Sequence, residues 1–135
     1  MRVYQATALF SVLFALVGFS YNVWRMQASE QNSSVRDASF EMLLQLAELE
    51  QLVYAAHYDG DTSAGNPRMG WVKVGLVVDL AVTSSKDVQQ SVAQLHSAWE
   101  ANWQEMPTER VAADKVVEAI DGARLAVREG LISLD

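Results

Sequence analysis

The two histidines, His57 and His96, are the side chains of this chain best suited to metal binding or proton transfer. Each lies at the edge of an apolar helical stripe, where a histidine can reach a haem or metal ion held between helices. Neither is paired with a glutamate three residues away, and the chain contains no cysteine. We therefore expect two histidines at the core boundary, each with one nitrogen in water, and no metal or cofactor site.

Motifs for catalysis and for phosphate or calcium binding are also missing. No Gly-x-Ser-x-Gly occurs, and "GNPRMG" lacks the lysine of a phosphate-binding loop. "DGDTSAGN" places Asp59, Asp61 and Ser63 at alternate positions, as a calcium loop does. Ala64 and Gly70 then stand where that loop needs glycine and glutamate. We expect a protein that is not an enzyme and has no catalytic residue.

The stretch "HSAWEANW" carries the strongest signal for binding. Trp99 and Trp103 lie one helical turn apart beside His96, and Trp71 is a further tryptophan. Two such rings can fill the core of a small bundle, or they can form a contact surface, since tryptophan is enriched at binding hot spots. The candidate partner contacts are Trp71, Trp99 and Trp103. The candidate ligand pocket comprises His57, His96 and Trp99.

The charge balance argues against nucleic acid as a partner. The net charge is −7, and residues 26–135 hold all 17 acidic side chains. The same residues contain eight basic side chains, with no clustered basic face. This balance repels the phosphates of nucleic acids and of anionic lipids.

An uncharged stretch of 22 residues, residues 3–24, precedes this acidic part. As a helix it is about 33 Å long, which matches the hydrocarbon core of a bilayer. Tyr4 lies near one end, and Tyr21 and Trp24 near the other, as expected for side chains at the membrane interface. A cleaved signal peptide is the alternative, with Gly18 and Ser20 as an imperfect cleavage site. We favour an anchor that contacts membrane lipid through residues 3–24.

The topology follows from the short N-terminal tail and the acidic remainder. Both suit a cytoplasmic N-terminus and a C-terminal domain outside the cytoplasm, although the positive-inside bias is small. We expect the bacterial inner membrane, with the C-terminal domain in the periplasm.

Beyond the anchor the periodicity is helical. The segment 26–37 is predicted to be a juxtamembrane linker or a helix that continues out of the bilayer, with capping-box spacing at Ser34 and Asp37. Apolar residues then recur every three or four positions, with a coiled-coil rhythm, over 42–56, 88–106 and 116–134. A loop is expected at 59–66, followed by Asn66 as N-cap and Pro67 as the first helical residue. Another helix is expected to begin at Ser84.

The segment 71–83 is ambiguous. Its valines and leucines alternate from Val72 to Val82, which is typical of a strand. The chain offers no second strand for it to pair with, so we favour a helix that is buried on several sides.

The predicted fold is all-α: one transmembrane helix followed by a small antiparallel bundle of about four helices. The predicted divisions are an anchor (1–25), a linker (26–37) and a helical bundle (38–135). We expect a non-catalytic, single-pass membrane protein whose bundle binds a protein partner or a second copy, as an accessory subunit of an envelope complex.

Two alternatives remain. The first is a ligand-sensing bundle that signals through a partner. In architecture alone, the layout resembles the membrane-proximal four-helix sensor domains of bacterial receptors. The second is a free periplasmic bundle, released after signal cleavage.

Overall fold

The computed structural model describes residues 2–134, and every regular element in that range is helical. The elements are α1 (Arg2–His57), α2 (Pro67–Leu80), a short 3₁₀ helix η1 (Ala81–Thr83), α3 (Lys86–Asn102) and α4 (Arg110–Ser133). The chain divides into two units, with the boundary between Ser34 and Val35 inside α1. The all-α prediction is confirmed for the described residues, and 71–83 is helical.

The first unit is the N-terminal part of α1, and its apolar side chains are exposed. Phe10, Phe14 and Phe19 are each about 70% exposed. None of the most apolar 18-residue stretch of this helix is buried. The hydroxyl groups of Thr7 and Ser11 donate to the carbonyl oxygens four residues earlier, at 2.8 and 2.9 Å. By length and composition this helix could cross a membrane.

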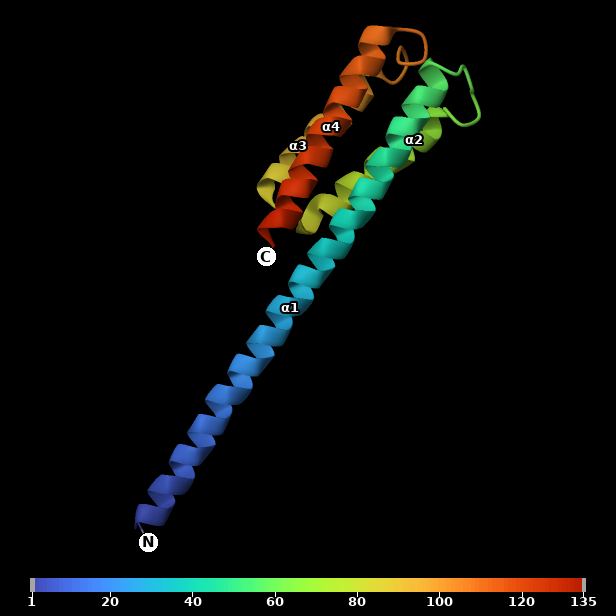
Figure 1. Cartoon of the computed structure of the whole chain (residues 1–135). Coiled ribbons are helices and arrows are strands. Elements are labelled where there is room, and N and C mark those ends of the chain that lie inside the picture. The colour runs from blue at the N-terminus through green and yellow to red at the C-terminus, as the bar shows by residue number, and fades with distance from the viewer. Residues whose placement is uncertain (1, 135) are drawn as a thin grey trace. The chain divides into compact units, whose positions relative to one another are not determined.

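The second unit, from Val35 onward, is a bundle of four helical segments: the rest of α1, and α2, α3 and α4. Figure 1 shows the loop after α1 and the turn before α4 at one end of the bundle, with η1 and the end of α4 at the other. The bundle encloses one apolar core to which all four segments contribute. Its largest fully buried side chains are Trp99, Met42, Leu46, Leu49, Leu95, Met106 and Ile120.

Local signals set the helix ends around the first loop as predicted. The side chain of Asn66 accepts a hydrogen bond from the Arg68 amide at 3.0 Å, and Pro67 follows it at the helix start. In the loop, Gly60 has a φ of 63°, a left-handed conformation that glycine adopts at little cost. Gly65 is buried against Ala56, so closely that a Cβ would overlap it.

Helix α1 continues through Ser34, so 26–37 takes the helical form, one of the two forms expected for it, and the capping-box spacing at Ser34 starts no helix. Two other expected boundaries are wrong. The N-cap of α3 is Ser85, whose hydroxyl accepts from the Val88 amide, and not Ser84. Helix α3 ends at Asn102, which leaves Trp103 as its C-cap and Met106 in the turn. These two residues continue the apolar rhythm because they pack on the core, with Met106 fully buried.

Candidate interaction site

The tryptophans predicted from the sequence meet at the seam between α2 and α3. Trp71, on α2, is surrounded by three rings of α3 and its C-cap. Its ring centroid lies 5.9 Å from that of His96, 6.4 Å from that of Trp99 and 6.2 Å from that of Trp103. All three contacts are edge-to-face, a geometry that aromatic pairs prefer. The four rings form an aromatic cluster that fixes α2 against α3.

The members of this cluster differ in what they offer to a partner. Trp99 is 0% exposed, so it is a core residue with no surface for contact. Trp71, Trp103 and His96 are half-buried and keep part of their surface in solvent. The space for Trp99 depends on Gly70, since a Cβ at that position would overlap the indole ring. The indole Nε1 of Trp99 is buried and has no hydrogen-bond partner within the described residues.

The two histidines lie in different surroundings. His57, at the end of α1, donates from Nδ1 to the carbonyl oxygen of Met106 at 2.9 Å. This bond ties α1 to the turn between α3 and α4. His96 contacts Trp71 and lies 4.0 Å from the carboxylate of Glu100. The contacts of His57 therefore belong to the α3–α4 turn and those of His96 to the aromatic cluster, and a pocket shared by both stays a prediction.

An apolar hollow lies along the same seam between α2 and α3. It does not include any of the three residues predicted to form a ligand pocket. Its walls come from the end of α2, from η1 and from the first turns of α3. The lining residues are Val78, Ala81, Val82, Gln89, Val92 and Ala93.

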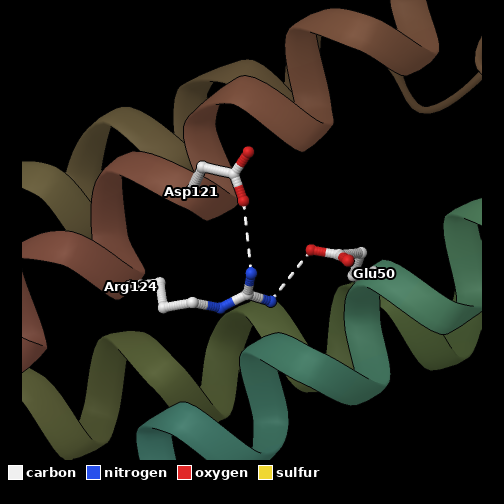
Figure 2. A network of polar contacts seen from close by, with 3 residues as sticks. All are labelled: Glu50, Asp121 and Arg124. Atoms are coloured by element: carbon white, nitrogen blue, oxygen red, sulfur yellow. Dashed lines mark hydrogen bonds and ion pairs between the residues drawn. The ribbon is translucent and has the colours of Figure 1, made fainter.

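Ion pairs join α1 to its two neighbours. Lys73 Nζ on α2 lies 2.6 Å from Glu48 Oε2, and Arg124 Nη2 on α4 lies 2.9 Å from Glu50 Oε2. Figure 2 shows that Arg124 also reaches Asp121 on its own helix, at 3.3 Å. No local sequence pattern indicates these ion-pair partners, because the pairs join residues 25 and 74 positions apart.

The pair at Glu50 also influences a neighbouring phenol. Partial burial and the Glu50 carboxylate, which both penalise the phenolate, raise the pKa of Tyr54 above its ordinary value of 10.0. Tyr54 is 40% exposed, and its ring packs edge-on against that of Tyr58, with the ring centroids 5.8 Å apart.

The described residues contain no group of three or more histidine, aspartate or glutamate side chains placed to hold a metal ion. Comparison with protein-family models, with curated proteins and with solved structures finds no match to this chain.

Proposed function

We propose that this chain is a single-pass membrane protein whose helical bundle binds a protein partner outside the cytoplasm, as a non-catalytic subunit of a membrane complex. The exposed apolar surface of the N-terminal unit carries the proposal. From Val3 to Trp24, every large apolar or aromatic side chain is at least 54% exposed, except Val23. Such a surface is stable in lipid and costly in water.

Two hydroxyl groups and the aromatic side chains near the two ends of this segment support the same environment. The hydroxyls of Thr7 and Ser11 are satisfied inside the helix, as a bilayer requires of any polar group. Tyr4 is 82% exposed near one end, and Tyr21 and Trp24 pair near the other with ring centroids 6.3 Å apart. In a bilayer these three aromatic side chains lie at the two interfaces.

The bundle supports a binding role. Trp71 and Trp103 present partly exposed rings on a rigid seam, and rings of this kind supply large contact areas at low entropic cost. The excess of acidic over basic side chains in residues 26–135 favours export of the bundle, here to the periplasm from a bacterial inner membrane.

Protease treatment of spheroplasts that carry the C-terminally tagged chain tests the anchor and its topology. We expect a full-length band that external protease destroys. A band protected until lysis contradicts the topology. A band about 20 residues shorter, released with the periplasm, shows a cleaved signal.

Cross-linking in intact cells, followed by size analysis in mild detergent, tests the binding role. We expect a discrete adduct larger than the chain. A chain that is monomeric in detergent and forms no adduct contradicts the binding role.

A further inference from the structure

A groove runs along the seam between α3 and α4. It consists of three adjoining hollows of about 340, 400 and 310 Å³. The first two share Lys115, and the last two share Gln94 and Gly122, so the hollows adjoin in a row from the turn before α4 to the last turns of that helix. We call it the α3–α4 groove.

The charges along the groove are nearly all negative. The lining includes one ammonium group, that of Lys115, and five carboxylates, and among residues 2–134 no ion pair engages any of the five. By contrast, the carboxylates between α1 and its neighbours are paired with Lys73 and Arg124. The five are Asp87, Glu105, Glu109, Glu118 and Glu129.

The fold explains two of these acids but not the others. Asp87 lies in the first turn of α3 and Glu109 is the N-cap of α4, where the helix dipole favours negative charge. Glu118 and Glu129 lie inside α4 and gain nothing from its dipole. Because a concave surface lined by one sign of charge concentrates the field, the groove attracts cations.

Gly122 gives the groove a second feature that the bundle itself does not use. It lies in the interior of α4, where glycine is less favourable than alanine. A Cβ at this position would meet nothing within 4 Å, so no neighbour in the bundle requires a glycine there. With Ala119 and Ala126 on either side, it leaves a shallow floor that a second backbone can approach closely. Leu125, 56% exposed at the rim, offers an apolar contact.

We propose that the α3–α4 groove docks a basic amphipathic helix of the partner protein, with its small or apolar side chains over Gly122 and its lysines or arginines on the flanking acids. This inference rests on the proposed function and specifies the partner. Both walls are helices, so the mode is a helix laid in a groove, without an added strand. A second copy of this chain, with its net charge of −7, is disfavoured as the occupant.

A synthetic helix tests the chemistry of the groove. The probe is an amidated 18-residue peptide with lysines on one face and alanine and leucine on the other, titrated into the full chain in a neutral detergent. The controls are a peptide with glutamate in place of lysine and a scrambled peptide of the same composition. We expect only the lysine helix to bind. Equal binding of the scrambled peptide would show that net charge alone causes the binding, and would overturn the proposal.

Three variants locate the binding. Glu118→Gln with Glu129→Gln removes two charges from the groove, and we expect at least a tenfold loss of affinity. The matched control, Glu41→Gln with Asp59→Asn, removes two charges outside the groove and should leave affinity unchanged. Gly122→Leu fills the groove without a clash of its Cβ, so we expect lost binding with an undiminished melting temperature. Equal losses in the two double variants overturn the proposal.

Photo-cross-linking in cells separates this inference from the proposed function. A cross-linking amino acid at Gln94 probes the groove, and one at Val72 probes the outer face of α2. We expect adducts from Gln94 whose attachment site maps to a lysine- or arginine-rich segment of the partner. Adducts from Val72 alone, or adducts attached to a neutral segment of the partner, overturn docking in the α3–α4 groove but leave the binding role intact. No adduct from either position counts against both.

Discussion

The indole ring of Trp99 lies against the backbone of Gly70, in the space that a side chain at position 70 would occupy. This relationship joins the last turn of α3 to the first turn of α2 and lets the largest core side chain be fully buried in a small bundle. It also makes one glycine of α2 structurally necessary, whereas Gly75 of the same helix faces open space.

Gly70→Ala should therefore lower the free energy of unfolding by about 1–3 kcal/mol, the usual effect of overpacking a core. Gly75→Ala, on the same helix, should be neutral or stabilising by up to about 1 kcal/mol, since alanine is the better helix former. Denaturant unfolding followed by circular dichroism measures both. Equal effects of the two substitutions would show that Trp99 does not need the space at Gly70.

Trp99→Ala should destabilise the bundle by about 3–5 kcal/mol, because it removes a buried indole and leaves a cavity. Trp103→Ala should destabilise the bundle less than Trp99→Ala, since part of the Trp103 ring is already in solvent. If the exposed rings contact a partner, Trp71→Ala and Trp103→Ala will reduce cross-linking in cells while the bundle stays folded. Unfolding by circular dichroism and adduct yield separate the two roles.

The Glu50–Arg124 ion pair should contribute more to folding stability than an exposed ion pair does. Its two side chains are 23% and 24% exposed, whereas those of Arg110 and Asp114 are 80% and 61% exposed. A double-mutant cycle with Glu50→Gln and Arg124→Met should give a coupling energy of about 1 kcal/mol, against about 0.3 kcal/mol for Arg110 and Asp114. A larger coupling for the exposed pair would contradict this ranking.

Tyr54 predicts a loss of stability at alkaline pH. Its pKa is raised in the folded state, so the unfolded chain releases this proton first as the pH rises. The stability that Tyr54 contributes is therefore fully present below pH 10.0, the ordinary pKa of tyrosine. It is lost as the pH rises through the higher pKa of the folded state. Urea midpoints measured across this range should fall more steeply for the wild type than for Tyr54→Phe. Parallel curves would show that Tyr54 does not contribute.

A charge in the N-terminal helix should weaken membrane insertion. Leu13→Arg lies in the middle of the uncharged stretch, where arginine costs about 2.5–3.5 kcal/mol. We expect part of the protein to leave the membrane fraction on alkaline carbonate extraction. Val72→Arg, at an exposed position of the bundle, should leave the fractionation unchanged. Full retention of Leu13→Arg would contradict an anchor that depends on residues 3–24.

The sequence by itself determined the class of fold and most of the local structure. Helical periodicity, Asn66 followed by Pro67, and the glycine-rich loop depend on residues close together in the chain, so they can be read from spacing alone. Periodicity was misleading at Trp103 and Met106, because an irregular turn can place side chains on the core as a helix does. For 71–83 the sequence fits the periodicity of a strand and of a helix, and the lack of a second strand to pair with favours the helix.

Only the tertiary structure decided which tryptophan is buried, which carboxylates are paired and where the groove lies. Each of these depends on distances between residues on different helices, such as Trp99 with Gly70, or Glu50 with Arg124. No local pattern encodes such distances, because they follow from how the helices pack. The same packing leaves Glu118 and Glu129 without a cation within the described residues and leaves Gly122 in open space, as the sequence alone could not reveal.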